Sequence, residues 1–447
     1  MSPSYARAAS CAHASCTRAV YGARACASST MHRLRSLPQV QPGEEALRGA
    51  SRRAYKRALR DASGGKKKGP RPKPKPADAA AAHRVELFVQ ELVSPLRKTL
   101  RAFPEPARMH PFERNMLELS LLASAQNAAT SGQSRRDTAE GGEARYLRAL
   151  DDCERARKKV HAAGREATSS VRNMLRPGGR ALASSVRGWS GMSWKEREDE
   201  AVRRTQEELG RTWSSVTTPA LDSLLTVVRV LRRLPEVDVD ACTIALVGAP
   251  NVGKSSLVRL LSSGRPEVRE YPFTTKGIVV GHFEVPDSDH GRCQVTDTPG
   301  LLPRTDVAER NAMEMLTLAS LRHLPTSVLF VIDPTGECGT SAEDQLSIRE
   351  QLRADFPDKP WLDVLSKADL VRELEGDADV VSEGASGHVV GLTPLAAEMT
   401  AMASAACPDA LRVSAVTNEG IDVLREEIGK RLVTSIADVS EAHELSE

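Results

Sequence analysis

The chain has 447 residues, a formal net charge of +3 and eight cysteines. This length exceeds what one ordinary hydrophobic core supports, so two folded domains plus unstructured segments are expected. The cysteines are scattered without any Cys-x-x-Cys pair, which argues against a disulfide scaffold or a cysteine zinc site and favours reduced thiols. No apolar stretch reaches the roughly 18 residues that span a bilayer, so no membrane insertion is expected.

The net charge hides a strong asymmetry between the two halves of the chain. Residues 1–240 carry 44 Lys and Arg against 26 Asp and Glu, a net of +18, whereas residues 241–447 carry 18 against 33, a net of −15. A basic half joined to an acidic half suggests that the first faces a polyanion and that the second holds a catalytic or switch module. The alternative is that the charge asymmetry arose by neutral substitution of surface residues and has no function.

The N-terminal segment has the composition of an organellar transit peptide, which we expect over residues 1–45. Its first 43 residues contain five Arg and no acid. A disordered basic tail is the alternative. Residues 46–81 are expected to form an extended basic linker, because 51–76 carries eleven Lys and Arg against one Asp and ends in alternating prolines.

Two different folding patterns follow the linker. In residues 82–240 apolar side chains recur every three or four positions, which predicts a bundle of four or five helices. Residues 241–435 alternate short β-branched runs with helical stretches, which predicts an α/β domain with a doubly wound, mostly parallel sheet before a flexible tail at 436–447. The predicted strands are Cys242–Val247, Ile278–Val285, Arg292–Thr296, Ser327–Ile332, Trp361–Leu365 and Leu411–Val413.

The strongest motif, G-x-x-x-x-G-K-[ST], begins directly after the first predicted strand. In such a loop, glycines turn successive backbone amides inward to cradle phosphates, assisted by the N-terminus of the next helix. Lys254 is expected to contact the β- and γ-phosphates, and Ser255 to bind Mg²⁺. The predicted nucleotide-binding residues here are Gly248, Ala249, Pro250, Asn251, Val252, Gly253, Lys254, Ser255 and Ser256.

A D-x-x-G motif ends a later predicted strand, at Asp297, Thr298, Pro299 and Gly300. Asp297 is expected to hold magnesium through its water shell, and the Gly300 amide to follow the γ-phosphate. Between the two motifs, a threonine hydroxyl is expected to complete the magnesium shell only when γ-phosphate is present. We favour Thr275 and keep Thr274 as the alternative, in a segment that also contains Phe273.

Base selection is expected after the strand 361–365. A carboxylate at Asp369 can accept both N–H groups of the guanine edge, which adenine cannot supply. Lys367 can lay its stem along the purine. Ser366 stands where the usual motif has an Asn whose amide helps to tie the base loop to the phosphate loop, so guanine preference with weakened affinity is expected. Ser414 and Ala415 end the last predicted strand and can offer a backbone amide to the guanine oxygen.

These motifs resemble the nucleolar GTP-binding protein 1 family of the Obg-related GTPases. The similar segments are 233–235, the phosphate loop, 271–282, 294–302, 309–311 and 327–333, with Phe103-Pro104 and His110-Pro111-Phe112 in the helical part. The resemblance covers roughly residues 85–435. It implies a GTP-hydrolysing factor for assembly of the large ribosomal subunit, with ribosomal RNA as partner and Mg²⁺ as cofactor.

Two departures from the family suggest an organellar version. The chain stops soon after the switch domain and begins with the apparent transit peptide, so a plastid is expected ahead of a mitochondrion, with the nucleus or nucleolus as the alternative. Basic clusters at 155–159 and 229–233 are expected to face the RNA. The sequence gives no indication of the oligomeric state.

Slow intrinsic hydrolysis is expected because Leu301 occupies the position of the water-orienting glutamine in Ras-like enzymes. The expected catalytic residues are Lys254, Thr275, Gly300 and Asn251. In related GTPases an asparagine at the loop position of Asn251 supports a potassium ion, and a purely loop-shaping role is the alternative. The rival functions are a signalling or trafficking GTPase, which would show a lipidation site or a glutamine after Gly300, and a GTP-sensing scaffold with negligible hydrolysis.

Overall fold

A computed structural model describes residues 34, 36–62, 77–130, 140–176, 189, 191–235, 237–271, 277–284, 292–303, 310–371 and 394–433. The chain forms two compact units. The helical unit comprises Arg33–Met109 and Ser124–Arg233, and the sheet unit comprises His110–Ala123 and Leu234–Glu447 together with residues 1–32, which lie outside the described ranges. Helix α5 (Pro111–Thr130) is therefore divided, and its first half belongs to the sheet unit.

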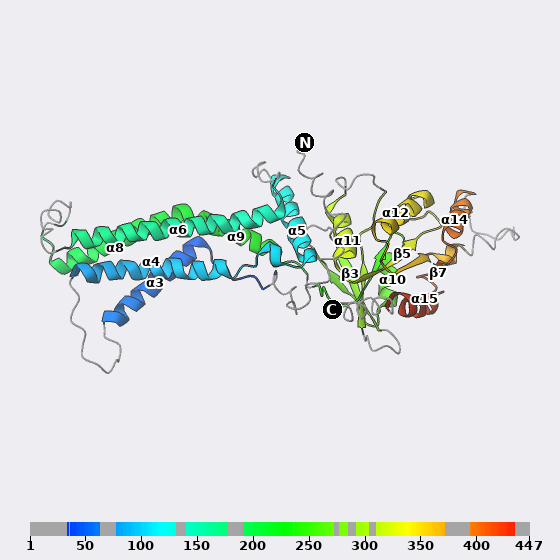
Figure 1. Cartoon of the computed structure of the whole chain (residues 1–447), viewed down its shortest axis with the longest axis horizontal. Helices are drawn as coiled ribbons and strands as arrows, with labels where there is room; N and C mark the ends of the chain where they lie inside the picture. Colours follow the sequence, from blue (N-terminus) through cyan, green and yellow to red (C-terminus); the bar gives the residue numbers. More distant parts are fainter. Residues whose placement is uncertain are drawn as a thin grey trace, which may run out of the picture. The chain divides into compact units, whose positions relative to one another are not determined.

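The helical unit is built on two long helices, α4 (Ala77–Arg101) and α6 (Gly142–Met174), which pack lengthwise (Figure 1). Gly164 permits their close approach, because a Cβ atom there would lie 2.6 Å from a methyl group of Val89. Helices α8 (Trp194–Thr212) and α9 (Thr218–Leu231) are joined end to end by the π turn η4 (Trp213–Thr217). A 3₁₀ turn, η2 (Pro106–Arg108), follows α4.

The expectation of an extended linker over residues 46–81 is wrong at both ends, because helix α3 spans Gly43–Ala62 and helix α4 already begins at Ala77. Arginine and alanine are strong helix formers, so a basic composition does not by itself indicate an extended chain. Tertiary contacts hold α3 in place: Trp213 Nε1 donates to the Gly43 carbonyl at 2.8 Å, and Arg53 Nε donates to Glu91 Oε2 at 2.9 Å. The proline-rich run 69–76 lies outside the described residues.

The sheet unit contains a seven-stranded sheet in the order β2-β3-β4-β1-β5-β6-β7. Strands β4, β1, β5, β6 and β7 run parallel, and β2 and β3 pair antiparallel at one edge. The described strands are β1 (Thr243–Val247), β2 (Glu267–Arg269), β3 (Ile278–Glu284), β4 (Arg292–Asp297), β5 (Thr326–Ile332), β6 (Trp361–Leu365) and β7 (Leu411–Arg412).

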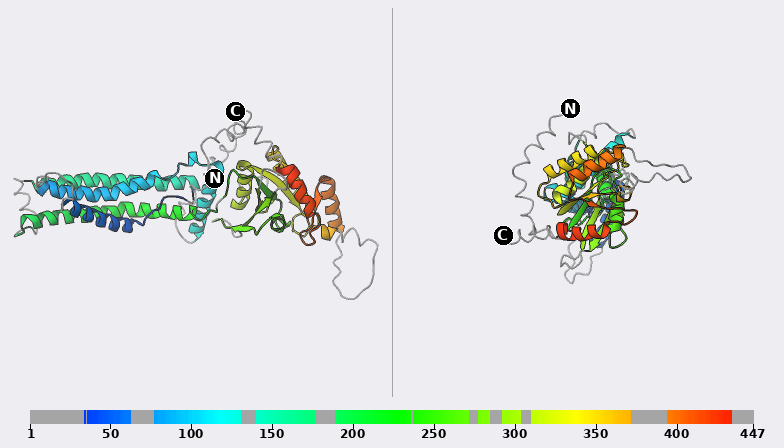
Figure 2. Two further views of the ribbon diagram at one scale, coloured as in Figure 1. Left: turned by 90° about the horizontal axis from the view of Figure 1, so that it is seen from below. Right: turned by 90° about the vertical axis from the view of Figure 1, so that its right-hand side faces the viewer.

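Helices cover both faces of this sheet (Figure 2). One core lies between the strands and the helices α10 (Lys254–Leu261), α15 (Ile421–Glu427) and the π turn η6 (Ile428–Val433). The other core lies beneath α11 (Ala312–His323), α12 (Ala342–Asp355) and α14 (Pro394–Ala406). Strands β1 and β5 are buried along their whole length, as expected for the centre of a doubly wound sheet.

The predicted fold class is confirmed: a helical region precedes an α/β unit with a mostly parallel sheet. All six predicted strands are present with small shifts at their ends. Strand β2 was not predicted, since three largely exposed residues at a sheet edge carry no hydrophobic pattern. No helix among the described residues is both long and apolar enough to cross a membrane.

The buried indole of Trp213 gives a test of how α3 docks. Replacing it with phenylalanine leaves the Gly43 carbonyl without its donor and opens a cavity, so docking should weaken by about 1–3 kcal/mol. Hydrogen exchange of the α3 amides should accelerate accordingly. Trp194→Phe is the matched control, because Trp194 is 41% exposed and should change little. Equal protection in both variants would contradict this account.

Candidate functional site

The carboxyl ends of the parallel strands gather the predicted motifs at one edge of the sheet. Because parallel strands share a direction, the loops that follow them meet at the same edge. The segments found there are the phosphate loop after β1, Asp297 at the end of β4, Asp333 after β5, 366–369 after β6 and 414–415 after β7.

The phosphate loop needs unusual backbone torsions. Gly248 has φ 152°, Asn251 φ 61° and Gly253 φ 99°. At Gly248 a Cβ atom would lie only 2.3 Å from the Val331 carbonyl oxygen of the neighbouring strand β5. Glycine is thus required there by contact as well as by torsion, and asparagine is among the few other residues that tolerate the left-handed region.

Lys254 is folded back onto this loop as the first residue of α10. Its side chain is buried, and Nζ donates to the carbonyls of Gly248 at 3.1 Å and Ala249 at 2.6 Å. Burial lowers the pKa of Lys254 to about 8. The enclosed ammonium group would regain an anionic partner if phosphate entered the loop, which would favour its charged form.

Ser255 and Asp297 form a hydroxyl–carboxylate pair between α10 and β4. Ser255 Oγ donates to Asp297 Oδ2, and burial raises the pKa of this carboxyl. The other oxygen, Oδ1, is buried without a hydrogen-bond partner among the described residues. A hydroxyl and a carboxylate oxygen fit Mg²⁺, a hard cation that takes one or two carboxylates plus substrate phosphates and water.

No cluster of three or more His, Cys, Asp or Glu that could hold a metal occurs in the described part of the chain. The Ser255–Asp297 pair offers two oxygen atoms, and Mg²⁺ usually completes its shell with substrate phosphates and water.

The D-x-x-G turn packs directly on the phosphate loop. A Cβ atom at Gly300 would lie 2.5 Å from the Pro250 backbone nitrogen, and the Leu301 amide donates to the Gly248 carbonyl at 3.1 Å. The Leu301 side chain is fully buried in the core beneath α11 and α12. It therefore points away from the phosphate loop, and Gly300 is held within contact distance of that loop.

Other predicted residues of these motifs contribute through the backbone or through structure. The side chains of Ala249 and Val252 are fully buried in the core, whereas that of Ser256 is exposed on α10. Thr298 is buried, and its hydroxyl donates to the Leu246 carbonyl at 2.7 Å, so it ties the turn to β1. The Pro299 carbonyl accepts a hydrogen bond from Thr317 at 3.5 Å.

The two segments predicted to select the base lie together. The Ala368 amide donates to the Val413 carbonyl at 3.0 Å, which places Asp369 near Ser414 and Ala415. Asp369 is partly exposed and makes no hydrogen bond or ion pair with a described residue. The Ser414 hydroxyl accepts from the amides of Val416 and Thr417, both at 3.1 Å, so this buried side chain shapes the loop that presents Ala415.

Asp333, to which the sequence interpretation assigned no role, organises the segment 366–369, which is called the base segment because it is predicted to select the base. It is fully buried at the end of β5 and accepts from the Thr335 and Cys338 amides. Its Oδ2 lies 2.7 Å from Lys367 Nζ, which also pairs with Glu337 at 3.2 Å. This ion pair fixes Lys367, whose φ is 54°. An acid directly after the apolar run Val328–Ile332 was the available signal.

Ser366 serves the sheet rather than the phosphate loop. Its backbone amide and its hydroxyl both donate to the Ile332 carbonyl, at 2.8 and 3.0 Å.

The predicted switch residues Phe273, Thr274 and Thr275 lie outside the described residues, so the choice between the two threonines stays a prediction.

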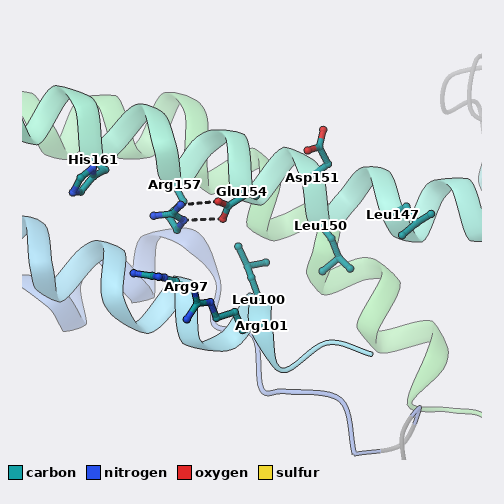
Figure 3. Close-up of a pocket in the computed structure, with 9 residues that line it drawn as sticks. All are labelled: Arg97, Leu100, Arg101, Leu147, Leu150, Asp151, Glu154, Arg157 and His161. Carbon is teal, nitrogen blue, oxygen red and sulfur yellow. Dashed lines mark hydrogen bonds and ion pairs between the residues drawn. The ribbon is translucent and has the colours of Figure 1, made fainter. Parts of the chain in front are cut away.

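A separate groove of about 680 Å³ runs between α4 and α6 in the helical unit (Figure 3). Arg97 and Arg101 reach into it from α4, while Arg157 and His161 line it from α6. Arg157 is neutralised by two hydrogen bonds to Glu154, at 2.6 and 2.7 Å. Arg97 and Arg101 are exposed and make no ion pair with a described residue within 4.0 Å, so the groove presents their guanidinium groups beside the acids Asp151 and Glu154, of which Glu154 also interacts electrostatically with Arg97.

The residues of the predicted basic cluster 155–159, on α6, differ in their availability. Arg155 pairs with Asp151 at 3.0 Å and with Asp152, whereas Lys158 and Lys159 are exposed without a described ionic partner. The groove arginines were not singled out from the sequence, because their proximity depends on how two helices pack.

Comparison with known proteins finds similarity to the same family that the motifs resemble. The sequence profile of the nucleolar GTP-binding protein 1 family matches residues 312–369, the segment from α11 to Asp369. The nucleolar GTP-binding protein 1 of Arabidopsis thaliana is 33% identical over 219 residues, which are 48% of this chain and 31% of that protein. The Caenorhabditis elegans protein of the same name is 43% identical over 140 residues, 31% of this chain and 20% of that protein.

The expected resemblance to the nucleolar GTP-binding protein 1 family is confirmed. A crystal structure of a nucleolar GTP-binding protein 1 from Plasmodium falciparum is 26% identical, covers 48% of this chain and 95% of that chain, and has a TM-score of 0.32. This chain spans less than a third of the two curated nucleolar GTP-binding protein 1 sequences.

The Asp333–Lys367 pair predicts a pH-dependent stability. Burial opposes the charged carboxylate, but hydrogen bonds from Lys367 and Thr335 outweigh it and lower the pKa of Asp333 below its ordinary 3.8. Its stabilisation is therefore complete above the unfolded pKa and is lost as pH falls through the lower folded pKa. Asp333→Asn should destabilise β5 and β6 by about 3 kcal/mol at neutral pH, because it leaves Lys367 without its buried partner.

Hydrogen exchange of the β5 and β6 amides measures this loss, which should shrink as the pH is lowered below about 4. Glu337→Gln removes the exposed partner of the same lysine and should cost at most about 1 kcal/mol. A pH-independent difference between Asp333→Asn and wild type would show that the charge is not what Asp333 contributes.

Proposed function

We propose that this protein binds GTP at the carboxyl edge of the sheet and hydrolyses it. The observation that carries the proposal is Asp369, a partly exposed carboxylate without a described partner, beside the Ser414–Ala415 loop. Such a carboxylate can accept two hydrogen bonds from the guanine edge, each worth about 1.5–3 kcal/mol. Lys367, held by Asp333 and Glu337, is the neighbour whose stem would cover one face of the purine.

The phosphates would occupy the loop 248–255. Lys254 would exchange its contacts with the loop carbonyls for the β- and γ-phosphates, and α10 would direct its N-terminal amides at them. Ser255 and Asp297 would hold Mg²⁺, which neutralises phosphate charge when bound. Thr275, or Thr274 in its place, would add a further hydroxyl to that ion.

Hydrolysis would be slow without assistance, since Leu301 is buried and no side chain at that position can orient a water molecule. Asn251 is exposed at the rim of the loop, where it would support a potassium ion. The same buried Leu301 favours a second candidate function, a GTP-sensing scaffold with negligible turnover.

The partner that we propose is a precursor of the large ribosomal subunit, contacted through its RNA. The resemblance to nucleolar GTP-binding protein 1 supports this role, and the basic groove between α4 and α6 supplies charge for phosphate contacts. The acid-free N-terminus supports action in an organelle, with a plastid ahead of a mitochondrion, whereas the names of the curated relatives support the nucleolus.

Replacing Asp369 with asparagine tests the nucleotide assignment. The amide cannot accept both guanine N–H groups, so affinity for GTP should fall at least about ten-fold. Affinity for xanthosine triphosphate, which presents a carbonyl in place of the amino group, should rise. Titration calorimetry with both nucleotides measures the two changes in affinity. Asp358→Asn, an exposed change at the other end of β6, is the control, and unchanged GTP binding in Asp369→Asn would refute the assignment.

The role of Asn251 can be separated from its backbone conformation. Asn251→Gly retains access to the left-handed region, at φ 61°, and removes only the side chain. In wild type, multiple-turnover phosphate release should be faster in potassium than in sodium at matched ionic strength, and the variant should lose this difference while still binding GTP. A potassium effect that survives in Asn251→Gly would assign the residue to loop shaping. No turnover in either salt, with or without ribosomal particles, would favour the scaffold.

The groove predicts a salt-dependent association with RNA. Arg97→Glu with Arg101→Glu should weaken binding to large-subunit precursors and reduce the salt slope by roughly 0.7–0.9 for each phosphate that the variant no longer neutralises. The control is Arg203→Glu with Arg204→Glu, an equal charge change at arginines already paired with Glu200. Sedimentation with precursors from plastids, mitochondria and nuclei, with GTP or GDP analogues present, also identifies the compartment. If both double variants weaken binding to the precursors equally, the loss reflects the change in net charge and not the groove.

A further inference from the structure

Two cysteines that are 51 residues apart in the sequence meet where β1 and β4 begin. Thr243 pairs with Gln294 in the parallel ladder, so Cys242 and Cys293 occupy the preceding positions of neighbouring strands. The Gln294 amide donates to the Cys242 carbonyl at 2.8 Å, which extends the ladder to this position. The two Sγ atoms are 2.6 Å apart.

The backbone geometry suits a bond between these sulfurs. Neighbouring strands lie about 4.8 Å apart, within the Cα separation of about 4.4–6.8 Å that disulfides span. Both side chains point to the same face, the core beneath α10. The two sulfurs, 2.6 Å apart, would need to approach by only about 0.5 Å to reach the S–S bond length of about 2.05 Å as the thiols lose their hydrogens.

The two cysteines differ in access to solvent. Cys293 is fully buried, whereas Cys242 is only partly buried. Hydrogen bonding between the sulfurs lowers the pKa of Cys293 and raises that of Cys242. A small oxidant can reach the pair through Cys242.

We propose that Cys242 and Cys293 form a reversible disulfide and so make the sheet unit a site of oxidative modification by hydroperoxides. One thiol attacks the O–O bond of the peroxide, giving a sulfenic acid and a first water or alcohol. The second thiol attacks that sulfur, the S–O bond breaks and a second water leaves. Two thiols thus lose two electrons and two protons, and the peroxide is reduced. A dithiol reductant reverses the reaction.

The expected consequence is stabilisation without loss of the ligand site. The bond would close a chain loop from 242 to 293 that contains the phosphate loop and α10, which restricts the unfolded chain more than the folded one. The pair lies four residues before the pairing of Leu246 with Asp297, or about 13 Å along the strands. The bond therefore ties the ends of β1 and β4 that are remote from Lys254 and Asp297.

Three other described cysteines serve as internal controls. Cys153, Cys338 and Cys407 are buried free thiols without a sulfur partner among the described residues. The Cys338 sulfur instead contacts the Thr340 backbone and the Gln345 side chain. They should stay reduced under conditions that oxidise the pair.

The test treats the full chain with hydrogen peroxide and blocks remaining thiols with an alkylating agent in denaturant. Peptide mass spectrometry of the monomer should then find a 242–293 cross-link that dithiothreitol removes. The thermal midpoint of the oxidised protein should rise and return on reduction. Cys242→Ser should abolish both effects, and Cys293→Ala, which removes the buried partner instead, should do the same.

Three results would overturn the proposal. In the first, both thiols are alkylated as fully after peroxide treatment as before it. In the second, Cys242 and Cys293 form disulfides only with other cysteines and not with each other. In the third, the 242–293 cross-link forms, but the thermal midpoint does not show the rise that Cys242→Ser is expected to abolish. None of these readouts uses GTP, so they are independent of the proposed function.

Discussion

The parallel pairing of β1 with β4 on one side and β5 on the other determines the rest of the sheet unit. Leu246 is paired with Asp297, and Val247 with Phe330, so β4 ends one residue before β1 and β5 continues two residues beyond it. A slip of one residue would move the Asp297 carboxylate to the opposite face and separate it from Ser255. Complete burial of β1 and β5 opposes such a slip, because it would misplace every apolar side chain along them.

Backbone contacts between neighbouring loops make the carboxyl edge of the sheet a single structure. The Val331 carbonyl excludes any side chain at Gly248, the Pro250 backbone excludes any at Gly300, and the Ala368 amide is bonded to Val413. Few side chains are then left to contact a ligand, and these include Lys254, Ser255, Asp297, Lys367 and Asp369. A small backbone shift in one loop is transmitted to the next, since each contact has no space to absorb it.

The sequence predicted the elements whose signals are local. The phosphate loop, the D-x-x-G turn and six strands depend on neighbouring residues, and their positions agree with the structure. What escaped prediction depends on contacts between distant segments. Asp333 acquires its role from Lys367, 34 residues later, and α3 is held by Trp213, 170 residues from Gly43. The thiol pair and the basic groove likewise require strand register and helix packing, which no local pattern specifies.

Two departures from the usual motifs share a physical explanation. Leu301 contributes to the core beneath α11, and Ser366 closes the end of β6 on the Ile332 carbonyl. Both side chains therefore stabilise the sheet unit instead of pointing to a ligand. With Ser366 committed to β5, the base segment depends on the Asp333–Lys367 ion pair for its position. Loss of that pair should disturb Asp369 more here than in a protein whose base segment also reaches the phosphate loop through an asparagine side chain.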